Sequence, residues 1–305
     1  MKKYGPERLD KKQEYSVAEL KKAIEKDEII SGKMIKTESN LDSIVRLGKN
    51  ITGKISKEDF QINVEGKQIK PVSILSKVGK TVKFKVKSIQ KKDEEYVAIL
   101  SRREAQEECK KEFIDKLQVG QIVDAMALHI ETFGIFCDIG CGIVALLPIE
   151  NLCIARIIEP KKWLRGIKKI KAIVKSIDDK GNITLTHREL LGTWEEEVSK
   201  FNIEETVTGI VRNIEDYGVF IQLTPNLVGL ADPYDGVNIG DCVSVFIRGF
   251  YPDKMKVKLM IISNNGPSDE NERIYFDYKI PESGFVKYWK YSPDNCERLV
   301  ESKFE

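Results

Sequence analysis

The sequence lacks the features that mark membrane and secreted proteins. No apolar run approaches the length that spans a bilayer. No apolar stretch follows the first residues either, so we expect no signal peptide. Only six cysteines occur among 305 residues, and their spacing is unlike that of a disulfide framework. These absences favour a protein of the reducing cytoplasm that does not contact a membrane.

Residues typical of catalytic and metal sites are also scarce. The only two histidines, His129 and His187, lie far apart in the sequence, and no G-x-S-x-G elbow provides a nucleophile. The cysteines Cys137, Cys141 and Cys153 include no C-x-x-C pair. A nucleophilic triad and a structural zinc site are therefore not expected.

One segment resembles a phosphate-binding loop. Residues 48–54, Gly-Lys-Asn-Ile-Thr-Gly-Lys, match most of that motif, but Ile55 stands where serine or threonine must hold magnesium. Strand-like sequence around Pro71 follows in place of a βαβ unit. We predict no catalytic residue, no metal and no cofactor. An RNA-processing enzyme is the least favoured interpretation, although the many acidic residues leave a metal-dependent nuclease open.

Charge is balanced overall but unevenly distributed. The net charge is +2, with 41% hydrophobic and 32% charged residues, as in soluble globular proteins. Residues 29–103 contain 17 basic and 8 acidic residues, whereas residues 191–262 contain 6 and 11. A length of 305 residues predicts two or three domains. The basic N-terminal domain predicts a polyanionic partner.

Parts of the sequence occur twice. Residues 132–139, Thr-Phe-Gly-Ile-Phe-Cys-Asp-Ile, recur as residues 216–223, Asp-Tyr-Gly-Val-Phe-Ile-Gln-Leu, at an offset of 84 residues. A fainter copy lies nearer the N-terminus, where Lys-Ser-Ile at residues 87–89 recurs at residues 175–177. One ancestral unit used three times is the simplest explanation.

Each copy consists of short strands. Ile135, Cys137 and Ile139 alternate with other residues, and this period of two predicts strands with one buried face. Glycines such as Gly134 and Gly218 mark turns or sharp bends. About five such strands in roughly 70 residues fit a small closed barrel of the OB-fold kind. We therefore predict a mainly β protein of three tandem five-stranded barrels.

The segments between the barrels have helical periodicity. Residues 102–117 and 189–201 place apolar residues at helical spacing among charges, which predicts amphipathic linker helices. Ser16 and Glu19 predict a capping box that opens a further helix.

The aromatic C-terminal stretch around a turn at 281–284 would form a stacking hairpin or pack on the third barrel or a neighbouring chain. The predicted domains are an N-terminal helical segment at 1–27, barrels at 28–103, 117–190 and 203–263, linker helices at 104–116 and 191–202, and a hairpin-like tail at 264–305.

Several motifs resemble the S-1 domain, an OB-fold named for the largest protein of the bacterial small ribosomal subunit. The resemblance is good over residues 117–190, fair over 203–262 and weak over 28–103. It rests on Val-Gly-Gln-Ile-Val at 119–123, Phe-Gly-Ile-Phe at 133–136, Leu-Leu-Pro at 146–148, Ile-Asp at 177–178 and Leu-Thr-His-Arg at 185–188. The resemblance implies that the barrels bind RNA.

The S-1 family contacts nucleic acid through two aromatics on the second strand, often a histidine on the third, and an aspartate and an arginine near the fifth. The resemblance assigns these positions to Phe133, Phe136, Pro148, Asp178 and Asn182 in the second barrel, and to Tyr217, Phe220, Asp232, Pro252 or Asp253, and Lys256 in the third. Lys258 shares a strand face with Lys256. The histidine is absent from both barrels, and the second lacks the arginine. In the first barrel Leu41 and Ile44 replace the aromatics.

Strand parity gives these rings a direction. Phe136 and Phe220 lie opposite the expected core residues Ile135 and Val219, so they should face solvent. Phe133 and Tyr217 sit beside a glycine and could either stack on bases or plug the barrel end. The resemblance favours stacking.

Basic residues complete the predicted RNA surface. The second barrel has a stretch without acids that contains Lys161, Lys162, Arg165, Lys168, Lys169, Lys171 and Lys175, and the first adds Lys77, Lys80, Lys83, Lys85 and Lys87. Contacts with phosphates are expected, with Lys168, Lys169 and Lys171 as site residues. The alternative is an edge strand that lysines protect from aggregation.

Taken together, these features predict a non-enzymatic, cytoplasmic protein that binds single-stranded RNA or mRNA in translation or mRNA handling. The small ribosomal subunit is a further expected partner. The alternative is an adaptor that docks on the ribosome or RNA polymerase with little affinity for free RNA. The absent histidines, and the missing aromatics of the first barrel, motivate that alternative. The sequence leaves the RNA motif and the oligomeric state open.

Overall fold

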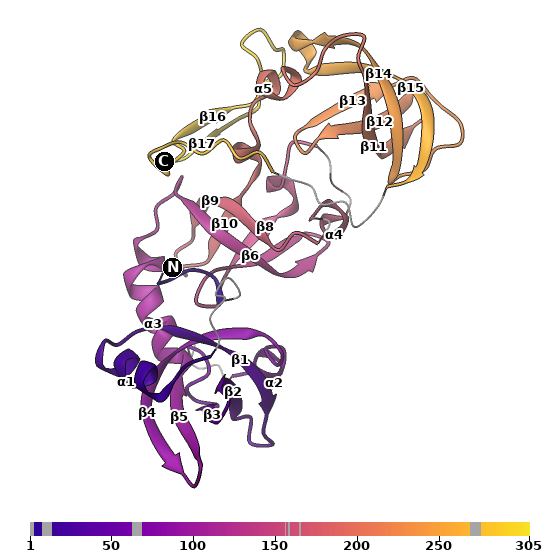
Figure 1. The fold of residues 1–305 in the computed structure, drawn as a ribbon. Coiled ribbons are helices and arrows are strands. Elements are labelled where there is room, and N and C mark those ends of the chain that lie inside the picture. The colour runs from indigo at the N-terminus through magenta and orange to yellow at the C-terminus, as the bar shows by residue number, and fades with distance from the viewer. Residues whose placement is uncertain are drawn as a thin grey trace. The chain divides into compact units, whose positions relative to one another are not determined.

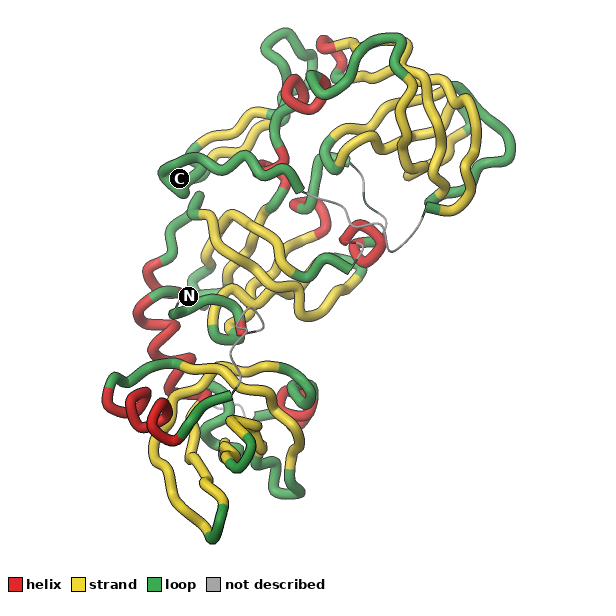
Figure 2. Tube along the Cα trace, viewed as in Figure 1, coloured by secondary structure: helices red, strands yellow, loops and turns green. Residues whose placement is uncertain are grey.

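Three closed five-stranded barrels follow one another along the chain (Figure 1), which confirms the predicted fold class. The computed structural model describes residues 3–7, 14–62, 69–155, 157, 159–164, 166–268 and 276–305. Strands predominate and the helices are short (Figure 2). The chain divides into two compact parts: one contains the first barrel, and the other contains the third barrel, most of the second and the tail.

The first barrel closes in the strand order β1-β2-β3-β5-β4. Its strands are β1 (Ile30–Thr37), β2 (Ser43–Gly48), β3 (Ile51–Ile55), β4 (Thr81–Lys92) and β5 (Glu95–Ser101). β3 and β5 run parallel, and the other neighbours are antiparallel. Val45 and Leu47 on β2 are fully buried, whereas Arg46 between them is exposed. This alternation is the pattern of a strand with one face in the core.

Three helices accompany the first barrel: α1 (Val17–Glu25), α2 (Pro71–Leu75) and α3 (Arg102–Glu112). The predicted capping box at α1 is confirmed. The Glu19 backbone N–H donates to Ser16 Oγ at 3.2 Å, and the Ser16 N–H donates to Glu19 Oε2 at 2.9 Å. A 3₁₀ turn at Ile114–Lys116 follows α3. None of the described helices is long and apolar enough to cross a membrane.

The second barrel closes in the order β10-β8-β7-β6-β9. Its strands are β6 (Ile122–Glu131), β7 (Gly134–Gly140), β8 (Ile143–Pro148), β9 (Lys169–Ile177) and β10 (Ile183–Thr186). The turn η3 (Ile149–Asn151) and the helix α4 (Pro160–Leu164) lie between β8 and β9, and η4 (Arg188–Leu191) follows β10. β8 and β10 run parallel, with Leu146 opposite Thr184.

The third barrel repeats this arrangement in the order β11-β12-β13-β15-β14. Its strands are β11 (Thr206–Glu215), β12 (Gly218–Thr224), β13 (Leu227–Ala231), β14 (Asp241–Tyr251) and β15 (Lys256–Pro267), with the turn η5 (Pro252–Lys254) before β15. The short helix α5 (Trp194–Val198) precedes β11 and opens with a capping box between Thr193 and Glu196. Buried valines, isoleucines and leucines of all five strands form its core.

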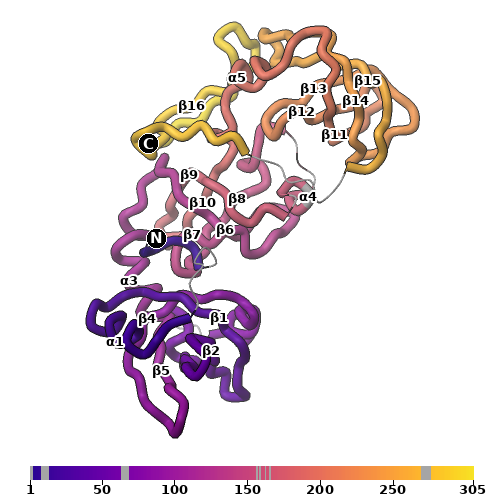
Figure 3. Tube along the Cα trace, viewed as in Figure 1, coloured from indigo at the N-terminus to yellow at the C-terminus, as the bar shows by residue number. Residues whose placement is uncertain are grey.

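The C-terminal tail ends in a two-stranded sheet of β16 (Tyr288–Lys290) and β17 (Glu301–Lys303). The expected turn is present, since the Gly284 N–H donates to the Pro281 carbonyl at 2.9 Å. It precedes both strands and does not join them. The tail also adds to the second barrel, because the Ile122 N–H donates to the Gly284 carbonyl at 2.9 Å. Figure 3 shows this last, yellow part of the chain beside β9 and α5.

Candidate nucleic-acid interface

Two exposed aromatic pairs with the same geometry lie on the second and third barrels. The rings of Phe133 and Phe136 have centroids 6.0 Å apart at an interplanar angle of 87°. The rings of Tyr217 and Phe220 have centroids 6.1 Å apart at 87°. Phe133 is 54% exposed and Tyr217 66%. Neither ring plugs a barrel end, so each pair presents ring surface to solvent.

Strand parity placed the second ring of each pair correctly. Phe136 and Phe220 are partly exposed, whereas the neighbouring Ile135 and Val219 are buried in the barrel cores. Whether these rings contact RNA stays a prediction.

The glycine between the aromatics is required by a close approach of two strands. A Cβ atom on Gly134 would lie 2.6 Å from the Leu147 carbonyl oxygen, and one on Gly218 would lie 2.4 Å from that of Ala231. Any side chain at these positions would force the second strand away from the third. The aromatic-glycine-x-phenylalanine pattern therefore reflects both the exposed rings and the backbone contact that positions them.

A third ring joins the pair on the second barrel. The His129 imidazole on β6 lies 6.5 Å from the Phe136 ring at an interplanar angle of 25°. Its Nε2 atom is 2.5 Å from Glu131 Oε1. The equivalent residue of the third barrel, 84 residues further along the chain, is Asn213. Its side-chain amide donates to Glu215 at 2.7 Å. Sequence reasoning did not assign His129 to the site, although its offset from Asn213 could have shown the equivalence.

In the third barrel the predicted lysines extend the aromatic surface across the strands. Phe220 on β12 is paired with Leu230 on β13, which is paired with Lys258 on β15. Lys258 and Lys256 are both exposed, and Lys256 is paired with Tyr251. An apolar ring and a cation therefore lie in one row across the outer face, which is the combination that suits a stacked base and its phosphate.

In the second barrel Asp178 and Asn182 close the turn between β9 and β10. The Asn182 N–H donates to Asp178 Oδ1 at 2.8 Å, and its side-chain amide donates to Oδ2 at 2.7 Å. These bonds from Asn182 lower the pKa of Asp178. Both residues are exposed, but part of their hydrogen-bonding capacity holds the turn. Their contact with RNA stays a prediction.

The predicted basic stretch of the second barrel lies partly on β9. Lys168 and Lys169 are exposed, and Lys171 is half-buried. The Lys171 backbone N–H donates to the Tyr278 hydroxyl of the tail at 3.1 Å. Arg165 lies outside the described residues, and the side chain of Lys162 does too.

The lysines predicted as phosphate contacts on the first barrel are instead engaged within the protein. Lys83 is only 2% exposed. The ammonium of Lys77 is 3.0 Å from the buried Glu7 carboxylate. Lys85 bridges Asp27 at 2.5 Å and Glu108 at 2.6 Å. The prediction of a cationic strand face was therefore wrong, and so was its edge-strand alternative, because β4 is paired on both sides.

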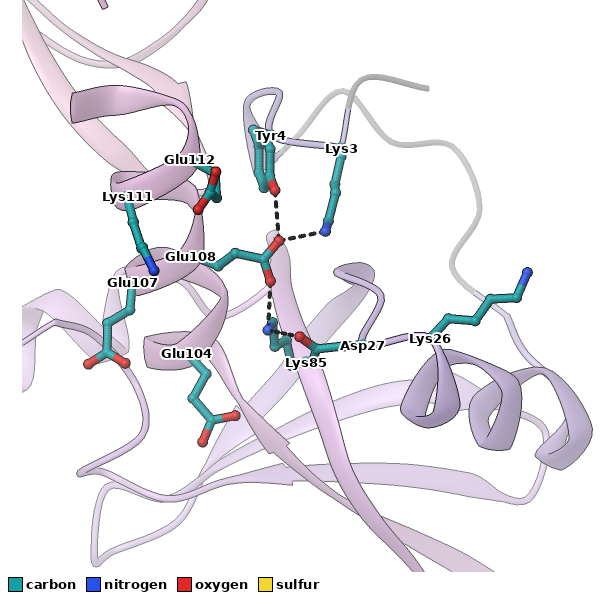
Figure 4. A pocket seen from close by; sticks show the side chains of 10 residues that line it. All are labelled: Lys3, Tyr4, Lys26, Asp27, Lys85, Glu104, Glu107, Glu108, Lys111 and Glu112. Carbon is teal, nitrogen blue, oxygen red and sulfur yellow. Dashed lines mark hydrogen bonds and ion pairs between the residues drawn. The ribbon is translucent and has the colours of Figure 1, made fainter. Parts of the chain in front are cut away.

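Figure 4 shows the carboxylate that neutralises Lys85. Glu108 on α3 also accepts from the Tyr4 hydroxyl at 2.8 Å and lies 2.6 Å from Lys3 Nζ. Burial opposes its ionisation, but hydrogen bonds from Lys3, Lys85 and Tyr4 outweigh this and lower the pKa of Glu108 to about 2. The surrounding hollow of about 640 Å³ is lined by both lysines and glutamates. It is therefore not a purely cationic phosphate site.

The aromatic tail packs inward. Phe276 lies 5.1 Å from Trp163 and 4.8 Å from His187, measured between ring centroids. Tyr278 lies 5.5 Å from His187. Trp289 and Tyr291 join the core cluster of the third barrel. The tail thus packs on both barrels, whereas sequence reasoning placed it on the third or on another chain. Tyr288 is exposed, and Tyr275 lies outside the described residues.

The motifs set aside in the sequence have structural roles. Residues 48–54 form the end of β2, a turn and most of β3, not a loop before a helix. Cys137, Cys141 and Cys153 are buried free thiols. Among the residues that the structure describes, no group of three histidine, cysteine or acidic side chains is placed to hold a metal ion.

Comparison with known proteins connects these barrels to a ribosomal family. No family model matches the chain. The chain is similar to small ribosomal subunit protein bS1 of Staphylococcus epidermidis, with 26% identity over 68% of this chain and 53% of the relative. The corresponding proteins of Rhodopseudomonas palustris and Rickettsia conorii are 32% and 29% identical over 43% and 58% of this chain, and 24% and 34% of their own length. The chain is an S-1-type OB-fold protein.

The S-1-type chain spans between about a quarter and a half of the length of these relatives. Among solved structures, it is similar to a multidomain protein with nucleic acid binding domains from Streptococcus pneumoniae. That match has a TM-score of 0.24 and 17% identity, and it covers 77% of this chain and 73% of the other. A TM-score this low supports no inference about function.

The first S-1-type barrel differs from the other two at the interface. In the first barrel Ile44 occupies the position that Phe220 has in the third. Ile44 is paired with Lys36 on one side and with Lys54 on the other. Lys54 is itself within 3.2 Å of Glu38 and 3.0 Å of Asp42. The first barrel therefore keeps the architecture without the stacking rings.

Proposed function

We propose that the chain binds single-stranded RNA through its second and third barrels and acts in translation or mRNA handling in the cytoplasm, without enzymatic activity. The observation that carries this proposal is the pair of exposed two-ring platforms, Phe133 with Phe136 and Tyr217 with Phe220, which share one geometry. Exposed rings on strands offer stacking surface to unpaired bases, at about 1–3 kcal/mol per base.

The similarity to small ribosomal subunit proteins supports the same proposal. Messenger RNA and the small ribosomal subunit are the partners that it implies. The chain spans only part of the length of these relatives. We therefore include a role on the ribosome in the proposal and not among the findings.

The test is a titration of the whole chain with short single-stranded RNA. The variant Phe136→Leu/Phe220→Leu keeps apolar side chains and removes both stacking rings. Each ring should contribute roughly 5- to 150-fold in affinity. The matched control is Leu41→Ala/Ile44→Ala, which changes the equivalent positions of the first barrel and should leave affinity nearly unchanged. Wild-type protein that fails to bind would refute the proposal, and the adaptor interpretation would then account better for the chain.

A further inference from the structure

Each barrel has an extra residue at the same place in its fourth strand. In the first barrel the consecutive residues Ile99 and Leu100 are paired with Ser88 and Val86, so Lys87 has no partner across β5. A residue inserted in this way is a β-bulge, which redirects its side chain and is frequent near functional sites.

The bulge recurs in the other two barrels. Thr184 and Leu185 are paired with Ser176 and Val174, which leaves Lys175 as the extra residue. In the third barrel the residues before and after Arg248, namely Ile247 and Gly249, are paired with Leu259 and Lys258.

The three bulges are equivalent by strand register. In each barrel the fifth-strand residue beside the bulge is paired, in parallel, with the third strand: Ile99 with Lys54, Thr184 with Leu146, and Lys258 with Leu230. The bulged residues Lys87, Lys175 and Arg248 are all basic and all exposed. A cation is thus presented at one position of the fold three times.

The groups that hold these cations differ. Lys87 is paired with two carboxylates, Asp59 at 3.1 Å and Glu104 at 2.9 Å. Arg248 is paired with one, Asp232, at 3.2 Å, and it also contacts the Met260 sulfur at 2.9 Å.

Lys175 is held by a neutral group. Its ammonium donates to the Asn151 amide oxygen at 2.9 Å, and within the described part of the chain it forms no ion pair. Asn151 is 1% exposed and also donates to the Leu185 carbonyl at 3.1 Å, so the amide is fixed in place. A phosphate that approaches Lys175 meets an uncompensated charge, whereas one that approaches Lys87 must compete with two carboxylates.

Lys175 is linked to the aromatic platform of its barrel through the turn η3. Asn151 ends the turn η3, whose first residue Ile149 donates its backbone N–H to the Phe133 carbonyl at 2.9 Å. One short turn therefore connects the backbone of Phe133 to the amide that orients Lys175.

We propose that Lys175 contacts the RNA backbone phosphate beside the base stacked on Phe133 and Phe136, that Arg248 makes a weaker contact of this kind in the third barrel, and that Lys87 makes none. This inference rests on the proposed function. It ranks the three cations by the carboxylates that each already faces.

The experiment is a salt titration of single-stranded RNA binding by the whole chain, with the variants Lys175→Gln, Arg248→Gln and Lys87→Gln. A phosphate contact on a single strand contributes about 0.7 to the slope of log affinity against log salt. Lys175→Gln should lower the slope by about that amount, so its deficit relative to wild type grows about fivefold for each tenfold fall in salt. Arg248→Gln should lower the slope less. Lys87→Gln should leave it unchanged, and Lys175→Arg should restore it.

The outcomes separate the two proposals. If wild type does not bind single-stranded RNA, the proposed function fails. If wild type binds and depends on its rings, but Lys175→Gln keeps the wild-type slope, the bulge inference is overturned while the function stands. Equal losses for Lys87→Gln and Lys175→Gln would also overturn it. Thermal unfolding of each variant shows whether a change in binding reflects a change in folding.

Discussion

The buried histidine of the second barrel makes stability depend on pH. His187 is 0% exposed, and its ring is enclosed by Trp163, Phe276 and Tyr278. Its Nδ1 atom lies 2.9 Å from the Leu152 carbonyl and its Nε2 atom 3.2 Å from the Tyr278 hydroxyl. A neutral ring that donates from Nδ1 and accepts at Nε2 satisfies both contacts. Burial lowers the pKa of His187 to about 4, against an opposing effect of the Leu152 hydrogen bond.

The sign and size of the effect follow from linkage. The unfolded chain binds a proton at His187 below about pH 6.5, whereas the folded chain does so only below about pH 4. Stability is therefore complete above pH 6.5 and falls as the pH drops towards 4. Each pH unit inside this window corresponds to about 1.4 kcal/mol. Through His187 alone, acidification from pH 7 to pH 5 should lower the free energy of unfolding by about 2 kcal/mol.

Urea unfolding followed by tryptophan fluorescence measures this change. All three tryptophans, Trp163, Trp194 and Trp289, lie in the part that contains His187. Asp138 on β7 of the same barrel titrates in this window with the opposite sign, because burial raises its pKa to about 6. The contribution of His187 is therefore the difference between wild type and a variant that lacks the imidazole. The variant His187→Asn keeps a donor for the Leu152 carbonyl but cannot be protonated. On acidification from pH 7 to pH 5 it should lack the loss of about 2 kcal/mol that His187 causes. The same pH dependence in variant and wild type would refute the assignment.

Two further substitutions test the packing that positions the rings and the barrels. Gly134→Ala places a Cβ atom 2.6 Å from the Leu147 carbonyl oxygen and should cost about 1–3 kcal/mol in urea unfolding; a loss below about 0.5 kcal/mol would contradict the close-approach argument. Asn226→Ala removes a buried amide that accepts from the Ile154 N–H at 2.8 Å and donates to the Arg188 and Gly192 carbonyls. It should cost about 1–3 kcal/mol, and wild-type stability would show that these groups find other partners.

The local patterns in the sequence were sufficient to predict the barrels and the direction of two rings. Successive side chains of a strand point to opposite faces, so Ile135 and Phe136 face opposite ways independently of the remaining sequence. The capping box of Ser16 and Glu19 is equally local, because its partners are three residues apart. Such features depend on neighbours in the sequence and can be recognised there.

The features that sequence reasoning missed depend on distant partners. Lys85 alternates with Lys83 and Lys87 as expected, but Glu108 and Asp27, which neutralise it, come from α3 and from the turn after α1. No periodicity in β4 reveals those carboxylates. The bulge at Lys87 is defined by the pairing of β4 with β5. The sequence of β4 alone therefore does not reveal it. The packing of the tail on the third barrel was predicted, but its packing on the second was missed, because the rings that cover His187 lie about 90 residues further along the chain.

The most direct test of the account compares single-stranded with duplex RNA of the same sequence, for the wild-type chain and for Phe136→Leu/Phe220→Leu. Rings stack only on unpaired bases, whereas cations attract any phosphate. Wild type should prefer the single strand. The variant should lose that preference and retain weak, salt-sensitive binding to both forms. A variant that discriminates between the two forms as well as wild type would contradict the claim that these aromatic pairs form the binding surface.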